Sequence, residues 1–176
     1  TPRRQRQMCI RDRYKAMLDF NFSRTVEDIR TLESFAEALR NSVKGLDKTD
    51  FKKSYRDGGM NIAQIIHHFC DTHTYAFLRT KHTLLEDNPS VKMYDVEEFL
   101  TTPDSNVLDI EDSLNVIDGI HAKWVSLLKT LSENELKKTY YHSSRDKNII
   151  LHEHVGMYAW HTCLLYTSPS PRDRNV

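Results

Sequence analysis

Histidine is the residue type with the clearest chemical potential in this chain. Three of the nine histidines, His67, His68 and His73, fall within two turns of one predicted helix, beside an apolar stripe with helical spacing. Neutral imidazole is the commonest protein ligand for divalent transition metals. A histidine on a helix is nevertheless more often a hydrogen-bonded structural side chain than a ligand, so this helix alone does not establish a metal site.

Histidines also lie on other predicted helices, and two of them, His121 and His161, bear on a possible metal site. His121 interrupts the apolar stripe of residues 109–131, where a hydrogen-bonded histidine at the edge of the core is the more frequent role. His161 lies close to the end of the last predicted helix. Histidines on facing helices can form a metal site in the core of a bundle, but a catalytic zinc typically has three protein ligands and one open position. A third ligand is therefore needed.

Other common reaction classes lack their characteristic residues. The chain has no glycine-rich phosphate loop followed by Lys-Ser or Lys-Thr, and no Gly-x-Ser-x-Gly nucleophile motif. Cys70 lies three residues from both His67 and His73, but such neighbours on one helix seldom form a nucleophile–base pair. A buried, inert thiol is the favoured interpretation of Cys70.

Four segments show the apolar spacing of amphipathic helices, and together they predict an all-α four-helix bundle. They cover residues 25–46, 61–87 and 109–131, and the chain from about residue 150 onward. No convincing β alternation is present. Residues 88–108 form a connection that is longer than most loops, with one helical turn expected near its middle, and we expect it to cross the bundle or to cover a site.

Residue chemistry predicts where these helices begin and end. Asn61 and Gln64 can form a capping box at the start of the second helix, and Pro89 should end it. Thr25 is expected to begin the first helix and Asp109 to cap the third.

The two ends of the chain do not resemble native protein sequence. Met8–Arg13 and Cys163–Asp173 correspond to translations of opposite strands of one adapter used in short-read DNA sequencing. We therefore interpret residues 1–13 and 163–176 as artefacts, and residues 14–162 as a single domain that is truncated at its C-terminal end.

Removing those ends changes what the composition implies. Residues 14–162 hold 18 Lys and Arg against 23 Asp and Glu, whereas the whole chain holds 25 of each. Without the basic N-terminal arm, neither nucleic acid nor a membrane surface is an expected partner. Cys70 is then the one remaining cysteine, which fits a reducing cytoplasm, and no apolar run approaches the ~18–20 residues of a membrane span.

Several short motifs, in one order along most of residues 50–161, resemble the DinB/YfiT-like family, particularly the YfiT branch of metal-dependent hydrolases and bacillithiol S-transferases. The motifs are Tyr55-Arg-Asp-Gly-Gly59, Ile65-Ile-His-His68, Asp71-Thr-His73, Leu84-Leu-Glu-Asp-Asn-Pro89, Val91-Lys-Met-Tyr-Asp95, His121-Ala-Lys-Trp-Val125 and Tyr158-Ala-Trp-His161. One departure is Met60, where relatives of the YfiT type generally carry tryptophan.

The resemblance implies a four-helix bundle, usually a homodimer, that holds a zinc or nickel ion with three histidines. His68 and His161 match two of these metal ligands. The third would fall at position 165, which is Leu165 within the adapter-like end, so the resemblance implies that this chain lacks it. The ion would activate water in a hydrolase, or a low-molecular-weight thiol in an S-transferase.

His73 and Asp71 are the candidates for acid–base catalysis or for supporting a ligand, because ligating histidines usually need a partner for the second ring nitrogen. His121 and Tyr158 are candidates for the pocket wall. A purely structural role is an equal alternative for each of the four. For the whole protein, the alternative is a non-catalytic helical protein that binds metal or a stress-related ligand.

Overall fold

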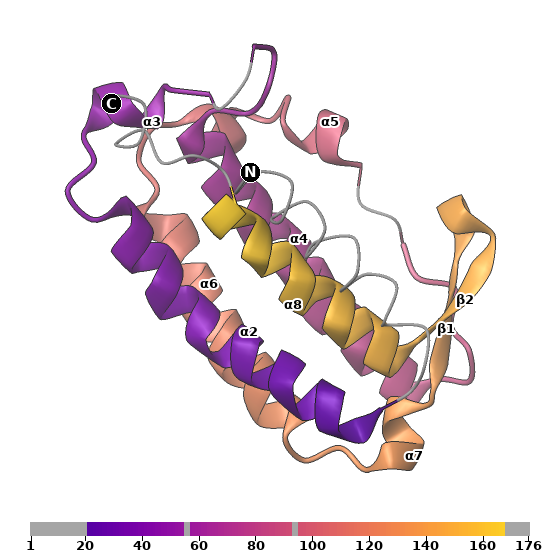
Figure 1. Ribbon diagram of the computed structural model, residues 1–176. Helices are drawn as coiled ribbons and strands as arrows, with labels where there is room; N and C mark the ends of the chain where they lie inside the picture. Colours follow the sequence, from indigo (N-terminus) through magenta and orange to yellow (C-terminus); the bar gives the residue numbers. More distant parts are fainter. Residues whose placement is uncertain (1–20, 55–56, 93–94, 168–176) are drawn as a thin grey trace, which may run out of the picture.

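The computed structural model describes residues 21–54, 57–92 and 95–167, with side chains up to Thr162 apart from those gaps (Figure 1). The adapter-like residues 1–13 and residues 168–176 lie outside this part. Four long helices form the bundle and confirm the predicted fold class. They are α2 (Phe22–Val43), α4 (Ile62–Leu85), α6 (Glu111–Leu128) and α8 (Leu151–Thr167).

The four helices form two parallel pairs rather than an alternating up-and-down arrangement. The first half of α2 packs with the first half of α8, whereas the second half of α2 packs with the first halves of α4 and α6. Helices α2 and α8 therefore run in one direction and α4 and α6 in the other. The buried residues that show this include Ile29, Leu32, Leu151 and Val155 in one cluster, and Phe35, Leu39, Ile66 and Ile117 in the other.

Because α4 and α6 are parallel, the chain between them must return along the length of the bundle. The connection does so beside α4, and it contains the short helices α5 (Val96–Phe99) and η2 (Pro103–Asn106). Its path is marked by contacts with successively earlier residues of α4, namely Lys92 with Arg79, Phe99 with Tyr75, and Asn106 with Gln64. The expected helical turn is present as α5, whereas η2 was not expected. The connection, which was expected to cross the bundle or to cover a site, runs lengthwise beside α4.

The predicted capping box at the start of α4 is present. The Asn61 side chain accepts a hydrogen bond from the Gln64 backbone N–H at 2.8 Å, and the Gln64 side chain accepts one from the Asn61 N–H at 3.0 Å. The helix ends at Leu85 with Glu86 at the C-cap, so the predicted end at Pro89 is too late. A proline excludes helix from the residue before it but does not require the helix to extend that far.

The starts of the other two capped helices differ slightly from prediction. Helix α2 begins three residues before Thr25, because the Asn21 side chain accepts hydrogen bonds from two backbone amides of the first turn. Helix α6 has Ile110 at the N-cap position, while the Asp109 carboxylate accepts from the Glu111 N–H at 3.1 Å. Asp109 therefore supplies the expected interaction from one residue earlier.

A β-hairpin between α6 and α8 departs from the expectation of helix alone. Strand β1 (Thr139–His142) pairs antiparallel with β2 (Lys147–Ile150), and a turn at residues 143–146 joins them. One buried pair, Tyr140 with Ile149, faces the core. Two four-residue strands with one inward pair show too little alternation to be detected in the sequence. Short helices α3 (Lys48–Phe51), α7 (Glu133–Leu136) and η3 (Ser143–Arg145) complete the described elements.

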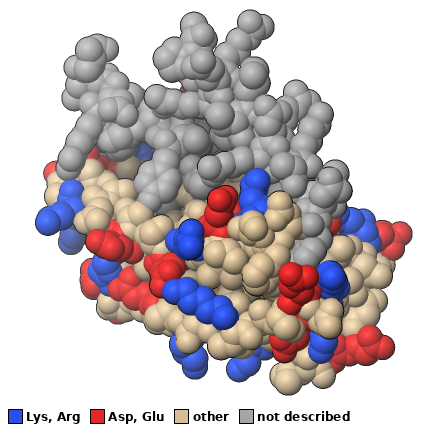
Figure 2. Space-filling view, turned by 60° about the horizontal axis from the view of Figure 1, so that its bottom comes forward, with Lys and Arg blue, Asp and Glu red and all other residues tan. Residues whose placement is uncertain are grey.

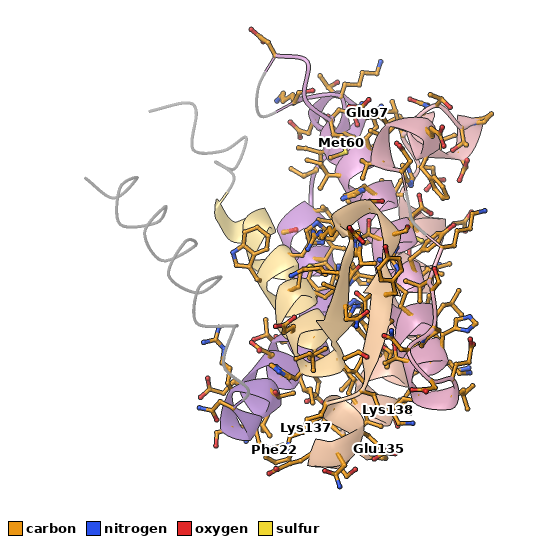
Figure 3. All side chains as sticks on the ribbon, turned by 90° about the vertical axis from the view of Figure 1, so that its right-hand side faces the viewer. Phe22, Met60, Glu97, Glu135, Lys137 and Lys138 are labelled. Atoms are coloured by element: carbon orange, nitrogen blue, oxygen red, sulfur yellow. The ribbon has the colours of Figure 1, made fainter. Side chains whose placement is uncertain are left out.

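The molecular surface gives no single-sign charge field on the face shown in Figure 2, where acidic and basic side chains are interspersed. No helix in the described part of the chain is long and apolar enough to cross a membrane. The two ends of the bundle are distinguished in Figure 3, with Met60 and Glu97 at the end where α4 begins and Phe22, Glu135, Lys137 and Lys138 at the opposite end.

Candidate metal centre

Four histidine rings from three helices meet inside the bundle, in the half nearer to Met60. They are His68 and His73 of α4, His121 of α6 and His161 of α8. The ring centroids are 5.5 Å apart for His68 and His161, 5.7 Å for His73 and His161, and 4.9 Å for His73 and His121. The antiparallel course of α4 and α8 places an early residue of one helix beside a late residue of the other.

The two predicted metal ligands, His68 and His161, face each other at one side of this cluster. Burial lowers the pKa of His68 to about 4. Burial, followed by the charge that His68 would carry, lowers the pKa of His161 to about 4. Both imidazoles are therefore neutral at pH 7, which is the form that binds a metal ion.

The remaining ring atoms of both histidines also suit ligation. The Thr72 hydroxyl lies 3.3 Å from His68 Nδ1, and His73 Nε2 lies 3.4 Å from His161 Nδ1. Ligating histidines commonly use one ring nitrogen for the metal and the other for a hydrogen bond that fixes the ring. The Nδ1 atom of each ring has such a contact here.

The described residues fit part of a divalent metal site. Within the described side chains, no three His, Cys, Asp or Glu groups converge in a way that could hold an ion. Helix α8 continues to Thr167, so the backbone at position 165 lies one turn beyond His161 on the same face. A histidine at this position would share the face of His161, as a third ligand requires.

The structure separates the two residues predicted to act in catalysis. His73 is fully buried in the histidine cluster and lies 2.8 Å from His121, between their Nδ1 and Nε2 atoms. Asp71 is half-buried on the side of α4 that faces η2, where burial and the nearby Asp104 carboxylate raise its pKa. No hydrogen bond joins the Asp71 carboxylate to a histidine of the described part of the chain.

His67 and Cys70 take structural positions on α4. His67 Nδ1 lies 2.8 Å from the Ser113 hydroxyl and its Nε2 lies 3.1 Å from the Val107 carbonyl oxygen, so both of its nitrogens have partners. Burial, together with the Asp71 charge, raises the pKa of the Cys70 thiol to about 11. The thiol is protonated at neutral pH, in keeping with the inert role favoured from the sequence.

Phe35 was not predicted from the sequence as part of this cluster, although its ring packs against two of the histidines. Its centroid lies 5.1 Å from that of His73, in a stacked arrangement, and 5.0 Å from that of His121. Its position between Leu32 and Leu39 on α2 was the available signal, because it adds one more apolar residue to the same stripe.

Tyr158 lies one turn before His161, as its candidate role at the pocket wall requires. Its ring centroid is 5.4 Å from that of His73, and its hydroxyl accepts a hydrogen bond from buried Arg79 at 3.2 Å. Burial raises the Tyr158 pKa. A surface cavity of about 340 Å³ lies at the other end of the bundle, lined by residues 85–88 and 137–139, and contains none of the histidines.

Comparisons with known proteins place this chain in a family. Residues 31–164 match the DinB superfamily. A protein of Oceanobacillus iheyensis is 38% identical over 135 residues, which cover 77% of each chain. YfiT of Bacillus subtilis is 31% identical over 134 residues, which cover 76% of this chain and 75% of YfiT. The names of both relatives assign them provisionally to the metal-dependent hydrolases.

A solved structure supports the same assignment. YfiT from Bacillus subtilis, described as a probable metal-dependent hydrolase with an unusual four-helix bundle topology, matches with a TM-score of 0.84 and 27% identity. The match covers 89% of this chain and 90% of that chain. Together with the family match over most of the bundle, this similarity shows that the chain belongs to the DinB superfamily, among the YfiT-like proteins.

Proposed function

We propose that this domain derives from a metal-dependent enzyme in which His68 and His161 hold a zinc or nickel ion, together with a third ligand at position 165 that this chain lacks. The observation that carries the proposal is the pair of partly buried, neutral imidazoles on facing helices, with centroids 5.5 Å apart. Bound by neutral ligands, such an ion would keep a large positive charge and would lower the pKa of a water or thiol.

Hydrolysis is the reaction that we propose first, because the relatives are named as metal-dependent hydrolases. A low-molecular-weight thiol in place of water would make the same site an S-transferase. Such a thiol would come from a second molecule, since the pKa of Cys70 is raised to about 11 and its sulfur gives no thiolate at neutral pH.

The side chains of the domain have distinct roles in this proposal. His68 and His161 bind the ion, while Phe69 packs against His161, with centroids 5.0 Å apart, and keeps water from that side of the ring. His73 supports His161 rather than contacting substrate. Asp71, beside η2, is a candidate proton acceptor because its raised pKa brings it closer to neutral pH.

Restoring the third ligand tests the proposal. We expect Leu165→His to bind Zn²⁺ or Ni²⁺ more tightly than the unmodified chain, by at least about tenfold. Leu164→His is the matched control, because it adds the same side chain about 100° away around α8. Competition with a chromogenic chelator measures the affinity, and equal affinities for the two variants would contradict the proposed ligand set.

Turnover separates the enzyme from the non-catalytic alternative. The Leu165→His protein, loaded with Zn²⁺ or Ni²⁺, is assayed against panels of esters, amides and electrophiles with added thiol. We expect metal-dependent activity that His68→Ala abolishes while the helical circular dichroism is retained. Tight metal binding without turnover in any panel would favour a metal-binding protein that is not an enzyme.

A further inference from the structure

We propose that a chain of hydrogen bonds, beginning at the Leu32 carbonyl and passing through His121 and His73, sets the tautomer of His161 and so presents its Nε2 atom for metal binding. The inference rests on the proposed function only where it treats Nε2 as a ligand atom. His73 and His121 are positioning residues in this proposal, because they act through His161.

The chain of contacts is continuous and crosses all four long helices. His121 Nδ1 of α6 lies 2.8 Å from the Leu32 carbonyl oxygen of α2. His73 Nδ1 of α4 lies 2.8 Å from His121 Nε2, and His161 Nδ1 of α8 lies 3.4 Å from His73 Nε2. Each imidazole therefore uses its Nδ1 toward the preceding member and its Nε2 toward the next.

The first member determines the proton positions of all the others. A carbonyl oxygen can only accept, so His121 Nδ1 must carry the hydrogen and donate it to Leu32. A neutral imidazole carries one N–H, so His121 Nε2 is an acceptor and His73 Nδ1 must donate to it. The same reasoning makes His73 Nε2 the acceptor for the His161 Nδ1–H. His161 Nε2 is then left with the lone pair that a metal ligand needs.

The surroundings hold the middle of this chain in place. His73 is 0% and His121 2% exposed, so bulk water does not compete for their ring nitrogens. The Phe35 ring is stacked on His73 at an interplanar angle of 21°, and the Trp124 and Tyr158 rings meet His73 edge-on. A ring flip of His73 would place carbon atoms toward both of its imidazole partners and break both contacts.

The expected benefit is a metal ligand that is prepared before the ion arrives. Without the chain, His161 would exchange between two tautomers, only one of which has the lone pair on Nε2. Partners that orient metal-ligating histidines typically contribute about 10- to 100-fold to metal affinity. A ligating histidine more usually has a single carboxylate or carbonyl partner. Here the hydrogen-bond chain places two imidazoles between His161 and the carbonyl oxygen of Leu32.

Nitrogen-15 NMR of histidine-labelled, metal-free protein tests the proton positions directly. In the unmodified chain at pH 7.5, we expect His121, His73 and His161 all to carry the proton on Nδ1. The tautomer with the proton on Nδ1 is the minor one for histidine in water. Finding it in all three residues would therefore not be expected without the hydrogen-bond chain. A proton on His161 Nε2 would overturn the proposal, and this measurement needs no variant.

A variant then tests whether His121 controls His161 at a distance. We expect His121→Phe to shift the His161 signals toward a mixture of tautomers, although the two rings are not in contact. His67→Phe is the matched control, since His67 is also buried but its nitrogens bond to Ser113 and Val107, outside the chain. An unchanged His161 tautomer in folded His121→Phe would overturn the proposal.

Metal affinity tests whether the hydrogen-bond chain affects the proposed metal site. In the Leu165→His background, we expect His121→Phe to weaken Ni²⁺ binding by about 10- to 100-fold, and His67→Phe to leave it within about threefold. A shifted tautomer with unchanged Ni²⁺ affinity would overturn the positioning role. If Leu165→His binds no Ni²⁺ while all three tautomers are as expected, the proposed function fails and the tautomer chain stands.

Discussion

At the scale of single residues, Arg79 is buried, and its hydrogen-bond acceptors within the described part of the chain are neutral. Arg79 is 6% exposed, and its guanidinium donates to the Tyr158 hydroxyl and to the Lys92 carbonyl oxygen, each at 3.2 Å. Its charge also lies over the Tyr75 ring, 5.6 Å from the centroid. Because these neutral groups stabilise the buried guanidinium in place of a carboxylate, the loss of any one of them should lower the free energy of unfolding.

Removing one acceptor tests that view. We expect Tyr158→Phe to lower the free energy of unfolding by about 1–3 kcal/mol, because a donor of buried Arg79 loses its partner. Tyr141→Phe is the control, since it deletes the same hydroxyl from an exposed bond to Asp146 and should change stability by less than about 0.5 kcal/mol. Urea denaturation of both variants provides the measurement, and equal losses would contradict this account of Arg79.

The contact between His73 and His121 could not be predicted from the sequence. Both residues were singled out by type, and His121 was expected to find a hydrogen-bond partner in the core, as it does. Periodicity assigns a residue to one face of its own helix but does not say which helix that face meets. The two rings lie 48 positions apart in the chain, and only the bundle geometry brings them together.

At the scale of secondary-structure elements, the N-cap of α4 bears on the candidate metal centre, because His68 lies less than two turns beyond it. We expect Asn61→Ala to destabilise the protein by about 1 kcal/mol, since the Gln64 N–H loses its acceptor. Asn61→Asp keeps an acceptor at the same place and should stay within about 0.5 kcal/mol of the parent. Chemical denaturation distinguishes them, and equal stability of the two variants would refute the role of the cap.

Local signals predicted some elements well and others poorly, for physical reasons. The capping box of Asn61 with Gln64 involves neighbours in the sequence, so residue types sufficed to place it. The hairpin depends on one buried pair, Tyr140 with Ile149, whose burial is a tertiary contact. The parallel order of α4 and α6 was visible only indirectly, through the length of the connection between them.

For the whole molecule, the many buried neutral histidines imply a strong dependence of stability on pH. Burial lowers the pKa values of His68, His121 and His161 to about 4, and that of His154 to about 3. In the unfolded chain these groups have ordinary values near 6.5. Between about pH 6.5 and pH 4 the unfolded state therefore binds protons that the folded state does not.

The sign of the effect follows from this difference. Stability should be complete above about pH 6.5 and should fall as the pH decreases toward 4, by about 1.4 kcal/mol per pH unit for each histidine fully in this range. Urea unfolding of the metal-free protein at pH 7.5, 6.5, 5.5 and 4.5 measures the slope. His121→Phe should reduce that slope by the contribution of one histidine, about 1.4 kcal/mol per pH unit. A free energy of unfolding that does not change from pH 7.5 to 5 would rule out neutral buried imidazoles.

The parallel packing of α2 on α8 also has a consequence for how the protein acquires its structure during synthesis. Ile29 and Leu32 leave the ribosome long before Leu151 and Val155, the residues that share their core cluster. Until then the apolar stripe of α2 lacks its final cover, and contacts between distant parts of a chain slow folding relative to local ones. The core therefore closes only once α8 has emerged, and an apolar segment such as the stripe of α2 is prone to aggregation while it stays exposed.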